Sequence, residues 1–385
     1  MKYIEKRTSP VRQELFRPEL LPAPDGREGR AVFFDIETTG LSTASAAVYL
    51  IGAMTREDDG WLLRQWFSEG LSDERRVIEE FFSFLGPSDV LVHFNGEGFD
   101  LPFLTHAASQ YRIPCPLNGL LSCDLYRSVR PFRRLLGTDH MNQKSMERYL
   151  GIFREDPFNG GELISVYEAW LVSPGDTALS SLLLHNEEDI LAMPALTSLL
   201  SYPAFLDGPK ELLEAGPEGD AFVIRCACRE RLPHAFRTVR TAFAAEGSDS
   251  LLEIRIPLIR GSAAHYFANY RDYYYLPFEG RAIHKSLAEF VDRAAKKKAT
   301  ARTACVRTSD CFVPWTGPLP EGAYDFYREF RDASPLIRLS DLGEEHPERT
   351  ELLLGSILRE LGQGKAEGQK TADAKSRPGR RRTRG

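Results

Sequence analysis

The chain lacks the features that would place it in a membrane or outside the cell. Its 385 residues contain no uninterrupted apolar run of about 18 residues, the length that a membrane-spanning helix needs. The first residues, MKYIEKRTSPVRQELF, have no apolar run after the basic positions, which a secretory signal would require. We therefore expect a cytoplasmic protein with no membrane partner.

Cysteine pairs are missing as well. The six cysteines include no C-x-x-C pair, and in a long chain without a secretory signal they are expected as reduced thiols rather than disulfides. Cys226 and Cys228 alternate in an expected strand and so share one face of it. Core packing explains this pair as well as a structural zinc site would.

Apolar residues are plentiful enough for packed domains. Hydrophobic residues make up 42% of the chain and aromatic residues 11%, which is typical of a globular protein. A chain of this length exceeds one ordinary core, so more than one domain is expected. The expected parts are an N-terminal extension (1–30), an α/β domain (31–203), a strand-rich accessory domain (207–330), a helical segment (331–361) and a disordered basic tail (362–385).

The first half has the pattern of a mixed sheet covered by helices. Ala31–Ile36 is a short, nearly all-apolar run, as in a buried central strand. Val48–Thr55 and Trp61–Ser68 predict a hairpin, and Asp89–Asn95 predicts a further strand. Helical periodicity follows, ending with a long helix over Thr177–Leu200. This order of strands and helices indicates an α/β fold.

The second half is richer in strands. Ala264–Leu276 is one of three expected strands in its first part, and Ser286–Ala295 and Arg338–Leu361 are expected as helices. Charge is uneven: from Lys365 onward eight basic residues stand against two acidic ones, so this tail carries +6 and the rest of the chain −12. The tail is open to two interpretations, nonspecific attraction of phosphates or simple solvation.

The first candidate motif lies at the end of the expected central strand, in FDIETTGL (34–41). Alternation places Asp35 and Glu37 on one face of the strand, with Ile36 on the other. Two carboxylates that point the same way from a buried strand repel each other, and a divalent cation relieves that repulsion. Hard oxygen ligands suit Mg²⁺ or Mn²⁺, so the motif predicts a metal site.

Two further motifs supply more polar groups. In NGEGFD (95–100), Asp100 falls at the start of a helix, where it either binds metal or caps that helix. In HNEED (185–189), His185 and Asp189 are four residues apart and share an inward face of the long helix. A buried acid and histidine need partners, which either a metal site or a helix-packing pair would provide.

Together the three motifs resemble the DEDD exonuclease superfamily, and most closely the YprB-type ribonuclease H-like domain, over about residues 30–203. NQKSMERYLG (142–151) and GELISVY (161–167) resemble the linker helices of that family. The resemblance implies a ribonuclease H-like mixed five-stranded sheet flanked by helices. It also implies a metal-dependent 3′→5′ exonuclease acting on single-stranded DNA or RNA.

The same resemblance assigns roles to individual residues. Asp35, Glu37, Asp100 and Asp189 would hold two Mg²⁺ or Mn²⁺ ions. Thr38, Thr39, Leu41 and Asn95 match positions that contact the substrate, although turn chemistry explains the threonines equally well. The superfamily places a water-orienting residue before the last acid, as Tyr in Y-x3-D or His in H-x4-D, whereas this chain has H-x3-D. Whether His185 acts as general base, as orienting donor or as neither therefore stays open.

Other readings of the chain belong to different classes. A nucleic-acid binding protein or adaptor with a ribonuclease H-like shell and no catalysis would be favoured by loss of an acidic ligand, yet all four acids are present. The candidates for binding the substrate outside the acidic site are two basic clusters (Arg130, Arg133 and Arg134; Lys296, Lys297, Lys298 and Arg302) and a tyrosine group (Tyr270, Tyr273, Tyr274 and Tyr275). Solvated faces and packing of a small β domain are the simpler interpretations of these groups.

Overall fold

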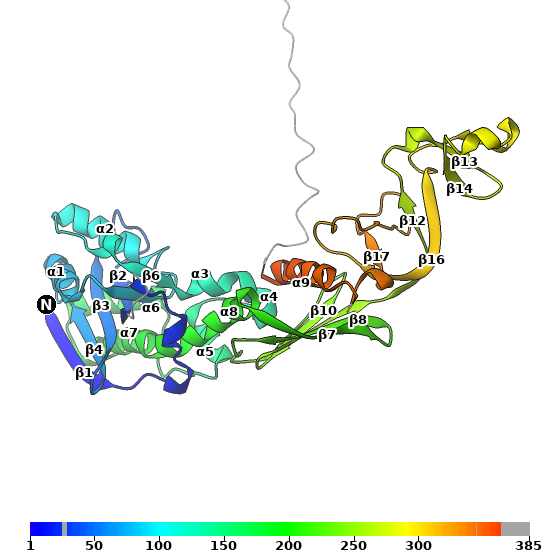
Figure 1. Cartoon of the computed structure of the whole chain (residues 1–385). Helices are drawn as coiled ribbons and strands as arrows, with labels where there is room; N and C mark the ends of the chain where they lie inside the picture. The colour runs from blue at the N-terminus through cyan, green and yellow to red at the C-terminus, as the bar shows by residue number, and fades with distance from the viewer. Residues whose placement is uncertain (25–28, 344, 363–385) are drawn as a thin grey trace, which may run out of the picture.

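The chain folds into two parts (Figure 1), and one cluster of buried apolar side chains contains residues of both. The computed structural model describes residues 1–24, 29–343 and 345–362. The N-terminal part is a mixed six-stranded sheet with helices on both faces, and the C-terminal part contains three smaller sheets. The predicted α/β class, with a mixed sheet and a smaller strand-rich second part, is confirmed.

The large sheet has the strand order β1-β4-β3-β2-β5-β6. Its strands are Lys2–Thr8 (β1), Arg30–Thr38 (β2), Val48–Glu57 (β3), Gly60–Phe67 (β4), Asp89–His93 (β5) and Leu121–Asp124 (β6). The first four in space are antiparallel to one another, whereas β5 and β6 run parallel to β2. Strand β2 therefore lies in the middle of the sheet, where the antiparallel and parallel halves meet.

The sheet has one strand more than the five predicted, because the N-terminal extension contributes β1. Lys2–Thr8 pairs with Trp61–Phe67 of β4. Its side chains are mostly exposed, since an edge strand is held by backbone hydrogen bonds and needs little apolar burial. A strand of this kind has no clear apolar alternation, which is why the sequence pattern did not reveal it.

Helices cover both faces of this sheet. They span Glu74–Phe84 (α1), Asp100–Tyr111 (α2), Leu125–Val129 (α3), Arg133–Leu136 (α4), Gln143–Tyr149 (α5), Gly160–Val172 (α6), Asp176–Leu196 (α7) and Ser201–Asp207 (α8). Along β2, Phe34 packs into the core under α1 and α2, whereas Phe33 packs into the core that contains α7. Asp35 and Glu37 share the face of Phe33 and therefore point toward α7.

Helix α7 is the central helix of the molecule. From Asp176 to Asp207 the chain is long and apolar enough to cross a membrane by length and composition, but 78% of that apolar window is buried inside the fold. It packs against β2 and β3. Burial of this kind explains the apolar composition as that of a core helix.

The C-terminal part begins with an antiparallel sheet of order β7-β8-β11-β10-β9. Its strands are Lys210–Glu218 (β7), Ala221–Cys228 (β8), Phe236–Val239 (β9), Ala244–Ser248 (β10) and Leu251–Pro257 (β11). Phe205 of α8 meets Phe236 of β9 with ring centroids 6.2 Å apart, so the core runs through from the first part into this sheet. Cys226 and Cys228 are buried in that core as free thiols.

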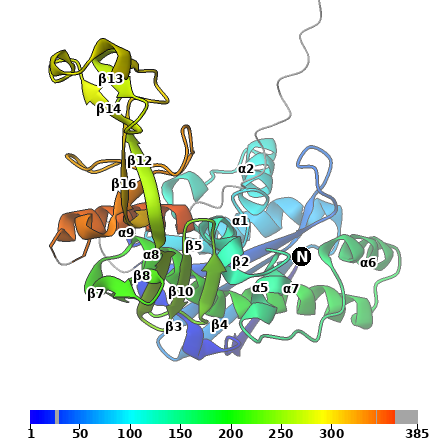
Figure 2. The same cartoon turned by 90° about the vertical axis from the view of Figure 1, so that its right-hand side faces the viewer.

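A long two-stranded ribbon then leads away from the body. It is formed by Ile259–Tyr266 (β12) and Cys305–Pro314 (β16), and Leu336–Arg338 (β17) pairs with the base of β16. Its far end carries a small sheet of Tyr273–Leu276 (β13), Arg281–His284 (β14) and Lys297–Lys298 (β15). Figures 1 and 2 both show this small sheet standing apart from the helical half. We call residues 267–304 the tip.

Two predictions for the tip are wrong. The strand expected over Ala264–Leu276 is divided into β12 and β13 by a 3-10 turn at Tyr270–Asp272. The helix expected over Ser286–Ala295 is replaced by two 3-10 turns, at Ala288–Phe290 and Arg293–Ala295. Short helices depend on a surface that buries their apolar face, and here the two large side chains Leu287 and Phe290 are 62% and 89% exposed.

The closing helix, α9, spans Pro347–Gly362 and so starts later than Arg338, where it was predicted to start. Proline suits the first position of a helix because its missing N–H is not needed there. The predicted disordered tail (362–385) lies, apart from Gly362, outside the described residues. The remaining short 3-10 turns are Gln13–Leu15, Pro18–Leu20, Leu71–Asp73, Leu117–Gly119, Arg130–Phe132, Thr197–Leu200 and Leu339–Asp341.

Candidate active site

The site is built around the end of β2. Pairing of β2 with β5 ends at Phe33, and farther along Asp100 Oδ1 accepts a hydrogen bond of 3.1 Å from the backbone N–H of Ile36. This bond ties the first residue of α2 to the strand, between the two acids of the first motif. Asp100 is therefore held at Asp35 and Glu37 by a backbone contact rather than by helix capping alone.

The turn before α2 is held by a buried acid that sequence reasoning missed. Asn95 has a positive φ of 65°, a left-handed conformation that is uncommon for residues other than glycine but more frequent for asparagine. Asp124, at the end of β6, accepts hydrogen bonds from the backbone N–H of Asn95 (3.0 Å) and Glu97 (3.2 Å). Its carboxylate thus fixes the loop that presents Asn95 and Asp100.

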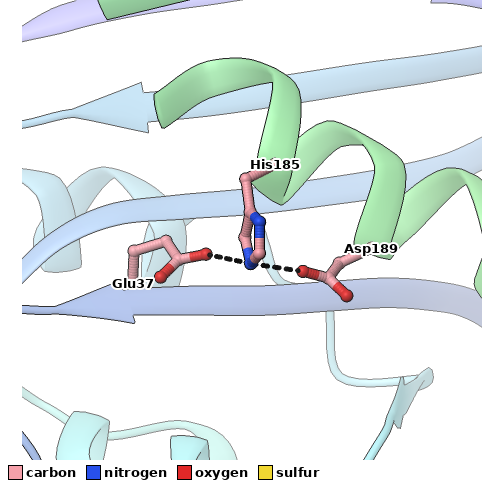
Figure 3. Close-up of side chains that lie close together, drawn as sticks. All are labelled: Glu37, His185 and Asp189. Atoms are coloured by element: carbon pink, nitrogen blue, oxygen red, sulfur yellow. Dashed lines mark ion pairs between the residues drawn. The ribbon is translucent and has the colours of Figure 1, made fainter. Parts of the chain in front are cut away.

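Helix α7 brings the third motif to the same place. His185 Nε2 lies 3.6 Å from Glu37 Oε1 and 3.3 Å from Asp189 Oδ2 (Figure 3). One ligand atom from each of these three residues lies within 4.8 Å of the others. The imidazole stands between the strand acid and the helix acid, so the close group in the described chain is Glu37, His185 and Asp189.

A cavity of about 250 Å³ joins this group to the other predicted residues. Its lining includes eight of them: Asp35, Glu37, Thr38, Leu41, Asn95, Asp100, His185 and Asp189. Thr39 is not part of the lining, because its hydroxyl accepts from Ala47 N–H at 2.9 Å and closes the loop after β2. Leu41, by contrast, is 83% exposed at the cavity edge.

His185 has a carboxylate partner on its other ring nitrogen. Nδ1 lies 2.6 Å from Asp156 Oδ2. That same oxygen accepts from Lys144 Nζ at 3.0 Å, and Oδ1 accepts from Phe158 N–H at 3.1 Å. Burial alone would raise the pKa of Asp156, but these donors outweigh it and lower the pKa. An ionised Asp156 only accepts, so Nδ1 of His185 carries a proton, and Nε2 is the ring nitrogen that faces Glu37 and Asp189.

Asp189 is held by an arginine. Arg154 Nη2 donates to Asp189 Oδ1 at 2.6 Å and, with Nε, forms a two-pronged pair with Glu147 at 2.5 Å for each bond. Both Arg154 and Glu147 are almost fully buried. The guanidinium occupies Oδ1 and leaves Oδ2 of Asp189 facing His185. Glu188 completes the attachment of this segment by accepting from the backbone N–H of residues 155 and 156.

Asp35 is oriented by an amide. Asn186 Nδ2 donates to Asp35 Oδ2 at 3.2 Å, and Gln65 Nε2 donates to Asn186 Oδ1 at 3.0 Å, which fixes the orientation of the amide. Helix α7 approaches the sheet so closely that a Cβ at Gly52 would lie 2.1 Å from Asn186 Oδ1. Asn186 sits beside His185 in the third motif, but its role depends on a contact across the sheet that no spacing reveals.

Without a cation, the carboxylates of the site repel one another when they are ionised. Burial raises the pKa of Asp35 and Glu37 well above their ordinary values, and the charges of Asp189 and Asp100 raise them further. Burial likewise raises the pKa of Asp100 to about 7, although backbone N–H donors oppose the shift. A hard divalent cation would remove this repulsion, so the oxygen-rich donor set fits Mg²⁺ or Mn²⁺.

Comparison with known proteins agrees with this architecture. Residues 32–201 match the family model described as the RNase_H superfamily. This part of the chain has a ribonuclease H-like fold. The match covers every predicted metal-binding residue, and the sheet order places them at the end of its central strand.

Several solved structures are similar to parts of this chain at low identity. A family B DNA polymerase from the archaeon Pyrobaculum calidifontis matches with 16% identity and a TM-score of 0.37, covering 68% of this chain and 41% of the polymerase. A nuclease in its apo form matches with 16% identity and a TM-score of 0.31 (46% and 74% covered). E. coli exonuclease I bound to an oligonucleotide matches with 14% identity and a TM-score of 0.27 (52% and 55% covered). No curated protein sequence gives a match.

Proposed function

We propose that the protein is a metal-dependent 3′→5′ exonuclease that hydrolyses terminal phosphodiesters of single-stranded DNA or RNA. The observation that carries the proposal is the convergence of Asp35, Glu37, Asp100 and Asp189 with His185 on one cavity. A ribonuclease H-like fold over residues 32–201 supports it. A cytoplasmic location belongs to the same proposal and agrees with the six free cysteine thiols.

The acids would form the metal centre. Asp35, Glu37, Asp100 and Asp189 would hold two Mg²⁺ or Mn²⁺ ions, which when bound stabilise the attacking and leaving oxygens of an in-line hydrolysis. The chain's own contribution is orientation. Asn186 directs the Asp35 carboxylate, the Ile36 N–H directs that of Asp100, and Arg154 leaves one oxygen of Asp189 free for the centre.

His185 would receive the proton of the attacking water. Its Nε2 faces the two acids, and its Nδ1 is bonded to Asp156, so a proton taken up at Nε2 creates an imidazolium that Asp156 stabilises. Leu41 and Asn95, at the cavity edge, would contact the terminal nucleotide. Two residues without side chains, Gly160 and Gly161, line the cavity at the start of α6 and leave room for the strand that enters.

The test is digestion of 5′-end-labelled single-stranded DNA and RNA of the same sequence, with Mg²⁺, with Mn²⁺ and with EDTA. A 3′→5′ exonuclease shortens the labelled strand stepwise, whereas cleavage from the 5′ end releases the label at once. Asp35→Ala and Asp189→Asn should abolish digestion. Glu187→Gln is a matched control, because Glu187 lies on the same helix but pairs with Lys6 outside the cavity.

Two outcomes would contradict the proposal. Digestion by both acid variants at the wild-type rate would show that the cavity is not the site of hydrolysis. Binding of the labelled strand without hydrolysis under any of these metal conditions would instead favour a non-catalytic nucleic-acid binding protein.

A further inference from the structure

The tip exposes large apolar side chains. Phe278, in the turn between β13 and β14, is 92% exposed, and Phe290, in the following 3-10 turn, is 89% exposed. Leu287 between them in sequence is 62% exposed. Isolated exposed apolar residues are common, but phenylalanines are normally buried because each offers a large apolar area. Phe278 and Phe290 have the highest exposed fractions among the large apolar side chains of the described residues, and both belong to the tip.

The tip also keeps small residues inside. Its buried side chains are mainly alanines, with Ala282, Ala288 and Ala299 almost fully covered and Leu276 the large one beside them. The little sheet is thus packed with alanine while its phenylalanines face solvent. A segment selected only for its own stability would place the aromatic rings in that core.

Charge separates the tip from the rest of the molecule. Residues 267–304 contain eight basic and four acidic residues, a surplus of four positive charges. The chain carries −6 in all and its tail +6, so the remainder carries −16. Lys297 and Lys298 are exposed and have no ion pair with any described residue, and adjacent positions of β15 point them to opposite faces.

Two tyrosines of this region contact other residues of the tip. Tyr273 stacks on Phe267 with ring centroids 4.3 Å apart, and the ring of Tyr274 lies under the ammonium of Lys296 at 5.3 Å. These rings are half-buried and already have partners. Phe278 and Phe290 are therefore the most exposed aromatic rings of the tip, whereas Tyr273 and Tyr274 have partners within it.

We propose that the tip binds single-stranded nucleic acid, with Phe278 and Phe290 stacking on bases and Lys297 and Lys298 contacting phosphates. Exposed rings together with unpaired cations fit a polyanion that offers flat base faces. The acidic remainder of the chain repels such a polymer, so the protein must bind it through a positively charged surface. This inference rests on the proposed function for the kind of polymer, and it gives the strand a second contact away from the cavity.

The experiment measures binding of the full-length protein to a fluorescein-labelled 30-nucleotide oligo(dT) by anisotropy, in EDTA so that metal-dependent hydrolysis does not occur. Phe278→Ala with Phe290→Ala should raise Kd roughly tenfold or more, the loss expected from removing base stacking. Lys297→Glu with Lys298→Glu should raise Kd similarly. It should also reduce the slope of log K against log salt by about 1.4, because each of two lost phosphate contacts on a single strand contributes about 0.7.

Matched variants at exposed positions outside the tip are the controls. Val172→Ala removes an 88% exposed apolar side chain from α6, and Arg76→Glu with Arg229→Glu reverses two exposed charges outside the tip. These should leave Kd within twofold of wild type. Equal melting temperatures for all variants would show that the fold is intact, as expected for exposed positions.

The results separate this inference from the proposed function. Wild-type binding by both tip variants would overturn the inference even if metal-dependent digestion is found, and the exposed phenylalanines would then be left for a protein partner. Equal weakening by the body variants would also overturn it, because charge anywhere on the surface would suffice. Weakened binding by the tip variants alone would support it even if no digestion is detected, in which case only the exonuclease proposal fails.

Discussion

His185 and Asp156 form a buried pair in which the imidazole Nδ1 lies 2.6 Å from a carboxylate oxygen. The two residues are 29 positions apart and belong to different segments, the helix α7 and the loop before α6. Because Lys144 and the Phe158 N–H also donate to this carboxylate, Asp156 keeps the proton of the neutral ring on Nδ1. The pair sets the direction of Nε2.

Asp156→Asn should therefore reduce kcat while leaving KM close to wild type. An asparagine amide can donate to Nδ1 and favour the ring form with its proton on Nε2, which cannot accept a proton from water. The expected loss is about 10- to 100-fold, as for removal of other orienting partners. Steady-state kinetics on the labelled strand would measure it.

The same substitution in a His185→Ala background provides the control. If Asp156 acts through His185, it should add little to the loss caused by His185→Ala. If the fold-losses in kcat of the two single variants instead multiply in the double variant, Asp156 stabilises the loop and does not act through the imidazole.

Arg154→Met should destabilise the protein. It leaves Glu147 buried without its cationic partner, at a cost of about 3–5 kcal/mol in the free energy of unfolding. Urea denaturation would measure the change. Removing both charges, in Arg154→Met with Glu147→Met, should recover much of the loss. If the free energy of unfolding of Arg154→Met alone lies within 1 kcal/mol of the wild-type value, water must reach the Glu147 carboxylate.

Gly52→Ala should separate α7 from the sheet. The new Cβ would lie 2.1 Å from Asn186 Oδ1 and 2.3 Å from Ile190 Cδ1, so the helix must shift. We expect a loss of roughly 1–3 kcal/mol in stability and a larger proportional loss of activity, because the helix carries His185 and Asp189. Gly216→Ala, where nothing lies within 4 Å of the added carbon, is the control. Full activity of Gly52→Ala would refute the close packing described here.

Mn²⁺ should raise the melting temperature of the wild type, because binding to the folded state alone stabilises it by about 2.7 kcal/mol at 100 times Kd. Glu37→Gln should lose most of this response. In EDTA, however, the same variant should melt above the wild type, since it removes a buried charge that Asp189 and Asp100 repel. Thermal scans with and without metal measure both effects. A wild type that melts at one temperature in Mn²⁺ and in EDTA would argue against a metal centre.

The sequence predicted the parts of the site that depend on local spacing. Alternation in β2 places Asp35 and Glu37 on one face, and the four-residue step in α7 places His185 beside Asp189. These are properties of single elements, and a strand or a helix fixes them wherever it packs.

The unpredicted contacts join different elements. Asp156, Arg154 and Asp124 act across loops, and nothing in their spacing shows which backbone or side chain they meet. Edge strand β1 and the turns of the tip were not predicted for a related reason, since neither buries a periodic apolar face. Periodicity reports burial, and these segments are shaped by hydrogen bonds and by tertiary position instead.

The ribbon of β12 and β16 also makes the tip an exchangeable module. Tyr266 and Cys305 are paired opposite each other, so the tip leaves and re-enters the ribbon at one rung of the ladder. Its length and sequence can change without altering the register below that rung or the packing of the ribonuclease H-like half. If the tip binds the nucleic-acid strand as proposed, replacement of this one insert would change substrate preference and leave the four acids unchanged.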